Sequence, residues 1–152
     1  MKRKDNPAKI FLRRYRSLSG RVDALNLAIN QALERAGNIS VQLKQVSVLS
    51  SPAESDPMAR DVCEAVDACA ILYQYKAEAE KALKEIMEAI ESVQDERQKA
   101  VLTMRYINGE QFLKISEKLF VSEPAIYIAH GRALLAVNRW MNAHGYGGEF
   151  GG

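Results

Sequence analysis

The sequence predicts an all-α protein in which a long N-terminal antiparallel helical hairpin precedes a C-terminal three-helix unit of the helix-turn-helix type. Three observations predict this class. Apolar residues recur at helical spacing through most of the 152 residues. Turn residues are scarce, because the chain has four prolines and five of its nine glycines lie in the last eight positions. A content of 47% hydrophobic and 26% charged residues is typical of a globular chain.

The first element is a helix expected from about residue 7 to residue 36. Apolar side chains alternate there at spacings of four and three residues, which is a heptad pattern. Its members are Phe11, Tyr15, Leu18, Val22, Leu25, Ile29, Ala32 and Ala36. Gly37 and Asn38 tolerate a left-handed backbone and are expected to end the helix. So narrow an apolar stripe requires a partner helix.

A long loop is expected at residues 38–57, where the apolar positions alternate and a cluster of Ser, Pro and Asp follows. Its length suggests a mobile segment or one that contacts a partner. Residues 58–94 contain neither Pro nor Gly and predict a second long helix, with Lys76 and Glu80 as a polar break in its seam. We expect this helix to fold back antiparallel on the first, so that residues 1–94 form one coiled-coil-like hairpin.

A separate helix-turn-helix domain is expected at residues 95–142, followed by a flexible tail at 143–152. A supporting helix precedes Asn108 and Gly109, a short helix covers residues 112–120, and a last helix runs from Ser122 to about Trp140. Ser122 suits the N-cap and Pro124 the first turn. Inward positions of the last two helices are Ile115, Leu119, Val121, Ile126, Ala129, Ala133, Leu134, Val137 and Trp140.

The net charge of +2 conceals a strong asymmetry along the chain. Residues 1–21 carry +7, residues 53–96 carry −8 and residues 97–142 carry +4. A basic N-terminal segment suits phosphate, but it equally suits a solvated face or the acidic second helix. Whether it touches DNA, its own acidic helix or a partner stays open.

Several function classes are not expected. The carboxylates lie on helix faces expected to be solvated, and no cluster of His, Cys and carboxylates suggests a catalytic site, so we do not expect an enzyme. Cys63 and Cys69 match no zinc spacing and are expected to be buried free thiols, with no metal and no cofactor bound. No apolar run is long enough to span a bilayer and no signal peptide is evident, so we expect a cytoplasmic protein that does not enter the membrane.

Binding of double-stranded DNA is the function expected of the C-terminal unit, because such units place the N-terminal part of the last helix in the major groove. A purely structural three-helix bundle is the alternative.

The candidate base-contacting residues are Ser122, Glu123, Ala125, Tyr127, Ile128 and His130. Glu123 could accept from cytosine N4, and Ala125 or Ile128 could contact a thymine methyl group. The candidate phosphate contacts are Arg105, Lys114, Lys118 and Arg132. With about four to six phosphates neutralised, log K should fall with log salt at a slope of roughly −4 to −5.

Residues 97–137 resemble region 4 of bacterial sigma factors. The matching positions are Arg97, Leu102, Arg105, Tyr106, Gly109, Ile115, Leu119, Ser122, Arg132, Ala133 and Leu134. Together with the preceding long helices, the chain up to Trp140 resembles the phage-encoded transcriptional regulators of the ArpU/RinA type. That resemblance implies activation of late phage genes in a bacterial host cell, through promoter DNA.

One departure from the sigma-like pattern concerns the turn. Such motifs commonly have Gly where Phe120 stands, so we expect a less sharp turn without a left-handed residue. Two other functions compete with a regulator: a small terminase-type packaging subunit that assembles into rings, and a helical adaptor that binds RNA polymerase. A single such unit binds DNA modestly, so a homo-oligomer, with a dimer favoured, or a polymerase partner is expected.

Overall fold

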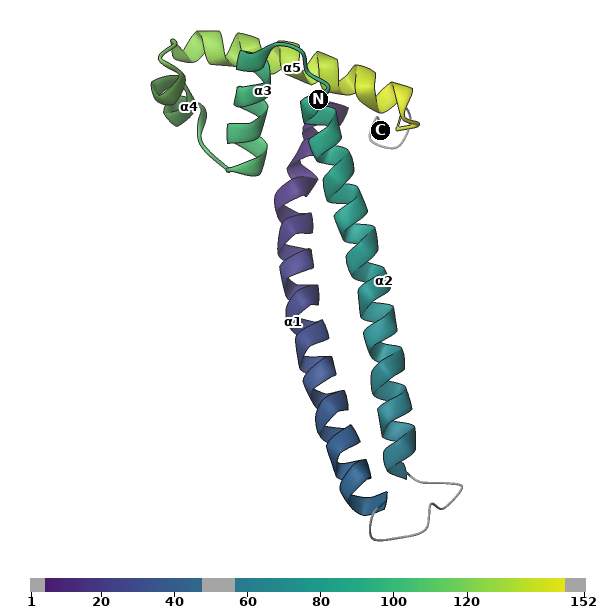
Figure 1. Ribbon diagram of the computed structural model, residues 1–152. Helices are drawn as coiled ribbons and strands as arrows, with labels where there is room; N and C mark the ends of the chain where they lie inside the picture. Colours follow the sequence, from purple (N-terminus) through teal and green to yellow (C-terminus); the bar gives the residue numbers. More distant parts are fainter. Residues whose placement is uncertain (1–4, 48–56, 147–152) are drawn as a thin grey trace. The chain divides into compact units, whose positions relative to one another are not determined.

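The computed structural model describes residues 5–47 and 57–146, and within these ranges the side chains of residues 39–47 and Met58 are left out of the description. In order, the described elements are α1 (Pro7–Ser47), α2 (Pro57–Glu91), α3 (Glu96–Leu102), the π-helical segment η1 (Thr103–Ile107), α4 (Phe112–Leu119) and α5 (Glu123–Ala143). The expected all-α class is confirmed, with two long helices followed by shorter ones (Figure 1). No helix in the described ranges is long and apolar enough to cross a membrane.

Helix α1 is longer than expected. It continues through Gly37 and Asn38 to Ser47, so residues 38–47 are helical where a loop was predicted. The physical reason is that glycine inside an exposed helix costs about 1 kcal/mol relative to alanine, which neighbouring helix-forming residues can offset. The rest of the predicted loop, apart from Pro57 at the start of α2, lies outside the described residues.

The chain divides into two compact units. Unit 2 comprises Gly20–Glu80, and unit 1 comprises Met1–Ser19 together with Lys81–Gly152. This division differs from the boundary expected after residue 94. A heptad pattern predicts an apolar face but does not indicate which element covers it. The pattern of α1 continues across Ser19, so it gives no sign of the boundary between the units.

Unit 2 is the antiparallel pair formed by the later part of α1 and the earlier part of α2 (Figure 1). Leu25 and Ile29 of α1 and Cys69 and Ala79 of α2 are buried there. Cys63 is exposed and Cys69 is buried, and both are free thiols, so the expectation of two buried cysteines is wrong for Cys63. A cysteine in a helical pattern is buried only if its own position faces the seam.

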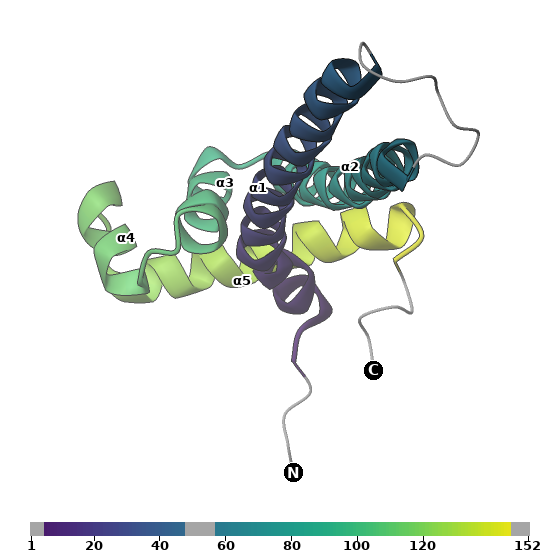
Figure 2. The same cartoon turned by 90° about the horizontal axis from the view of Figure 1, so that it is seen from below.

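Unit 1 is built around a core to which both ends of the chain contribute. The core residues are Ala8, Phe11 and Leu12 of α1, Ile86, Ala89 and Ile90 of α2, Val93, Leu102 and Tyr106, and Ala133, Leu134, Val137 and Met141 of α5. Most of these side chains are almost fully buried. Figure 2 shows the start of α1 crossing α5. The first helix is therefore part of the C-terminal unit as well as of the hairpin.

The beginning of the predicted flexible tail is packed against this core. The ring of Tyr146 lies 5.2 Å from that of Phe11 and 5.9 Å from that of Trp140. Its hydroxyl group donates to the Glu85 carboxylate. The prediction of a flexible tail from residue 143 is thus wrong up to Tyr146, because aromatic packing offsets the flexibility of Gly145. Residues 147–152 lie outside the described part.

Candidate nucleic-acid interface

A small second core holds α3, α4 and α5 together. Val101, Ile115, Ile126 and Ala129 are buried in it. Met104, Phe112, Leu119 and Val121 pack around them and are partly buried. Each of the three helices supplies at least one fully buried side chain, so the angle between α4 and α5 is fixed by packing as well as by the turn that joins them. The inward positions expected for this part of the chain are confirmed.

The turn between α4 and α5 is left-handed at Phe120. This residue has φ 56° and ψ 39°, and its side chain is 93% exposed. The N–H groups of Phe120 and Val121 both donate to the carbonyl of Ser116, the latter at 3.2 Å. The prediction of a less sharp turn without a left-handed residue is therefore wrong. A left-handed non-glycine residue costs roughly 1–2 kcal/mol, which these two bonds and the burial of the flanking apolar residues offset.

Helix α5 begins as expected. Ser122 has an extended backbone, and its hydroxyl oxygen accepts from the N–H of Ala125 at 3.4 Å. Pro124 lies in the first turn, where a missing N–H removes no helical bond. In the first turn of α5 the N–H of Ala125 is thus capped and Pro124 has none, and the start of the helix carries a partial positive charge.

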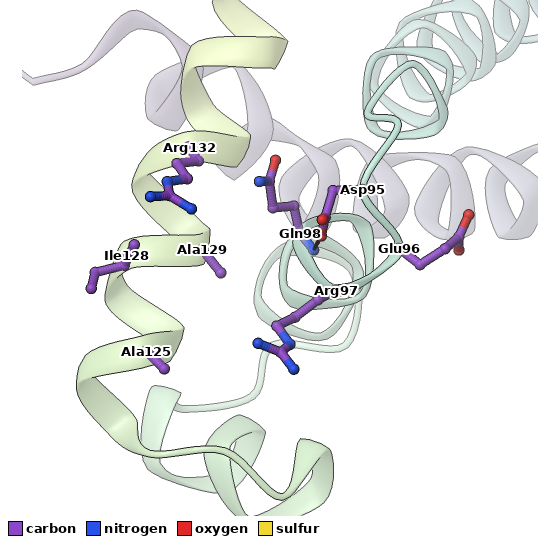
Figure 3. A pocket seen from close by; sticks show the side chains of 8 residues that line it. All are labelled: Asp95, Glu96, Arg97, Gln98, Ala125, Ile128, Ala129 and Arg132. Atoms are coloured by element: carbon purple, nitrogen blue, oxygen red, sulfur yellow. Dashed lines mark hydrogen bonds between the residues drawn. The ribbon is translucent and has the colours of Figure 1, made fainter.

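One face of α5 forms a groove with the start of α3. The groove has a volume of about 400 Å³ and is lined by residues 95–98 and by Ala125, Ile128, Ala129 and Arg132 (Figure 3). Asp95 caps α3 by accepting from the N–H of Gln98 at 2.9 Å. Ile128 is 58% exposed, and Arg132 is exposed as well. The expected base-contacting positions Ala125 and Ile128 thus share one face with the expected phosphate contact Arg132.

Arg97, which matches the sigma-like pattern, is a functional candidate that was not among the expected DNA contacts. It is exposed and stands on the α3 wall of the groove, facing the α5 wall that carries Arg132 (Figure 3). Among the described residues, neither arginine has an ion-pair partner. The cap at Asp95 could have indicated that Arg97 lies in a first helical turn. The position of α5 opposite Arg97 results from tertiary packing and has no signal in the local sequence.

Tyr127 lies on a neighbouring face of α5. Its side chain is 53% exposed, and its ring centroid is 4.7 Å from that of Phe112 at the start of α4. Glu123, in the first turn, is partly exposed, and Ser122 is exposed. The groove and the Tyr127 side are therefore two faces at the N-terminal end of one helix.

The three remaining expected phosphate contacts all interact within the chain. Lys114 and Lys118 are exposed; Lys114 lies 3.7 Å from a Glu117 oxygen, and Lys118 pairs with Glu110. Arg105 is partly buried: it donates to the Glu110 carbonyl at 3.1 Å and lies 4.4 Å from the centre of the Phe112 ring. Arg105 therefore shapes the connection between η1 and α4, and the two lysines are partly neutralised.

His130 is buried, and the expectation that it lies on the exposed face is wrong. It is 6% exposed, and its Nε2 lies 2.8 Å from the hydroxyl oxygen of Tyr106. Burial, followed by the charges of Lys9, Arg105 and Arg13, lowers its pKa to about 4, so the ring is neutral at pH 7. Position 130 is one helical turn beyond Ile126 and shares its inward face.

The family model described as "Protein of unknown function (DUF1492)" matches residues 56–138, which is more than half of the chain. The match includes all of α2, α3, η1 and α4, and most of α5. No curated protein and no solved structure matches the chain.

Proposed function

We propose that this chain, which belongs to the DUF1492 family, is a DNA-binding transcriptional regulator that places the N-terminal part of α5 in the major groove. The observation that carries the proposal is the junction of α4 and α5. A short helix, a left-handed turn at Phe120 and a Ser122-capped helix follow one another over a common core, and the outer side of the second helix is left exposed.

The charges around this junction favour a polyanion. Arg97 and Arg132 line one groove together with Asp95 and Glu96, and neither arginine has an ion-pair partner among the described residues. Lys114 and Lys118 stand on α4, where their carboxylate partners can be exchanged for phosphates in a salt-dependent equilibrium. With these four side chains on phosphates, log K should fall with log salt at a slope of about −3.6. His130 is buried, and Arg105 lies away from this groove, at the connection between η1 and α4, so neither belongs to this count.

The side chains on the reading face favour a contact that is largely apolar. Ala125 and Ile128 suit thymine methyl groups, and Glu123 suits the amino group of cytosine. Arg132 lies one turn beyond Ile128, at a position suited to a phosphate at the edge of the groove. Because this face has few hydrogen-bonding side chains, discrimination between DNA sequences should be modest for a single copy of the chain, so a second copy or a partner would sharpen it.

The resemblance to ArpU/RinA-type regulators leads us to propose phage late promoters as the biological target. A duplex library with a randomised centre, selected by binding to the full chain, would reveal the preferred site. A recurrent motif with an A·T-rich contact region supports the regulator. Assembly into a ring of eight or more subunits would instead favour a packaging subunit, and capture of RNA polymerase by the chain without DNA would favour an adaptor.

The direct test is fluorescence anisotropy with a labelled duplex of about 30 base pairs, long enough to hold one or two such sites. The double variant Arg97→Gln with Arg132→Gln should bind at least about tenfold more weakly at low salt, because two phosphate contacts are lost. Arg60→Gln is the matched control: it removes an exposed arginine from the acidic helix α2 and should leave binding unchanged. Absence of wild-type binding at low salt would refute the proposal.

A further inference from the structure

A second cavity in unit 1 is lined by positive charge and lies apart from the groove between α3 and α5. Its volume is about 260 Å³. The lining residues are Lys9, Arg13 and Arg16 of α1, Arg105 and Tyr106 of η1, and Gly109, Phe112 and His130. None of them lines the groove between α3 and α5.

The three basic residues of α1 reach one cavity because of their spacing. Lys9, Arg13 and Arg16 stand at i, i+4 and i+7, which places them on one face over two helical turns. Arg105 adds a fourth positive charge from a segment nearly ninety residues later in the chain. Like charges brought together in this way repel one another and lower the stability of the folded state, unless an anion joins them.

The carboxylates of the chain compensate this charge in part. Asp5 lies 3.6 Å from Arg13, and both side chains are more than half exposed, so this pair is weak. Arg105 uses one N–H group on a neutral backbone carbonyl. Within the ranges that the structure describes, Lys9 and Arg16 have no carboxylate within ion-pair distance. The cavity therefore has an excess of positive charge.

The loop at Gly109 leaves room for one of these cations. Gly109 has φ +72°, and a Cβ built on it would lie 2.5 Å from Arg16 Nη1. A residue with a side chain would therefore push the guanidinium group away, in addition to straining the backbone. Glycine lets Arg16 lie directly against the loop that joins η1 to α4.

Two neutral polar groups complete the lining. The Tyr106 hydroxyl and His130 Nε2 lie 2.8 Å apart. The cations Lys9, Arg105 and Arg13 help to lower the pKa of His130, which agrees with a positive potential at the ring. The guanidinium and ammonium groups that line the same cavity are donors common in sites for tetrahedral oxyanions.

We propose that this cavity is a binding site for a phosphate group, held by Lys9, Arg16, Arg13 and Arg105. Guanidinium groups match the oxygens of a phosphate in a bidentate manner, and the volume admits a phosphate with a small organic substituent. The phosphate could belong to a small phosphomonoester or to the DNA backbone. The site does not require the proposed DNA binding, because its residues differ from those of the groove.

Isothermal titration of the full chain with inorganic phosphate tests this site, with sodium chloride at matched ionic strength as the reference. The double variant Lys9→Gln with Arg16→Gln should weaken phosphate binding at least about tenfold, because two charge-assisted contacts are lost. Arg35→Gln removes an exposed arginine of α1 in unit 2 and should change nothing. If folding of the double variant is impaired by circular dichroism, the exposed single change Arg16→Gln replaces it.

Two competition arms identify the source of the phosphate. Glycerol 3-phosphate binding that a DNA duplex does not displace indicates a small phosphomonoester, whereas displacement of inorganic phosphate by the duplex indicates the DNA backbone. Equal affinity of the wild type and the Lys9 and Arg16 variants for phosphate overturns the proposal. The variant carrying Arg97→Gln and Arg132→Gln should lose DNA binding but keep phosphate binding. The proposal for the groove and the proposal for this cavity can therefore be refuted independently of each other.

Discussion

The neutral, buried imidazole of His130 makes the stability of the protein depend on pH in a window where few other groups titrate. Its pKa is about 4 in the folded chain, mainly because burial disfavours the charged ring. In the unfolded chain it should be close to 6.5. Above pH 6.5 the ring is neutral in both states and the full stability is present. As the pH falls below 6.5, the unfolded state binds a proton that the folded state does not, so the free energy of unfolding decreases.

The magnitude follows from these two pKa values. Between pH 7 and pH 5.5 the protonation of the unfolded state alone lowers the free energy of unfolding by about 1 kcal/mol. Urea unfolding at the two pH values measures this difference. His130→Gln is the test variant, because its amide group can still form a hydrogen bond with the Tyr106 hydroxyl but does not titrate. We expect the pH-dependent loss in the variant to be smaller than in the wild type by about 1 kcal/mol. Equal losses in both proteins would refute a neutral, buried His130.

Three further substitutions test the contacts around α4 and α5 by thermal unfolding. Phe120→Gly should stabilise the protein by up to about 1 kcal/mol, because removing the strain of a left-handed residue outweighs the flexibility of glycine. Phe120→Ala keeps the strain and serves as the control. A lower Tm for the glycine variant than for the alanine variant would contradict the left-handed turn. Ser122→Ala should cost about 1 kcal/mol through loss of the cap, and Ser17→Ala, at an exposed position of α1, serves as the control. Tyr106→Phe should cost about 1–3 kcal/mol by leaving a buried imidazole nitrogen without a partner; a cost no greater than that of the exposed Tyr73→Phe would argue against the bond.

Local features of the fold were well predicted from the sequence. The helical period gave α2 within a few residues, and the Ser122 cap with Pro124 located the start of α5. These signals lie within a few positions of one another, so they depend little on the rest of the molecule. The small core around Ile115 and Ile126 followed from the same spacing.

The incorrect predictions concern which side chains are buried and which parts of the chain they pack against. The seam of α1 predicts a buried face, yet only the structure shows that Phe11 belongs to the core of unit 1. His130 was assigned to the surface by residue type, although its position on α5 is an inward one. At Phe120 the geometry of the turn prevailed over residue preference. In each case tertiary packing outweighed a local tendency. The local tendency can be read from a single sequence, but the tertiary packing cannot.

The candidate site was predicted in part. The expected residues Ala125, Ile128 and Arg132 lie together on one groove, but Arg97, on its opposite wall, is not among the expected DNA contacts. The sequence alone leaves open whether the basic N-terminal segment contacts DNA, the acidic helix or a partner. Its residues Lys9, Arg13 and Arg16 line a cavity beside Arg105, which is the basis of the proposed phosphate site.

The salt dependence of DNA binding tests the central proposal most directly. Anisotropy titrations of the full chain with one duplex at several salt concentrations should give a slope of log K against log salt near −3.6, for about four phosphate contacts. In the variant carrying Arg97→Gln and Arg132→Gln the slope should fall to about −1.8, since two of those contacts are removed. An unchanged slope in the variant would place the DNA elsewhere on the protein, and no binding by the wild type at low salt would contradict a DNA-binding function.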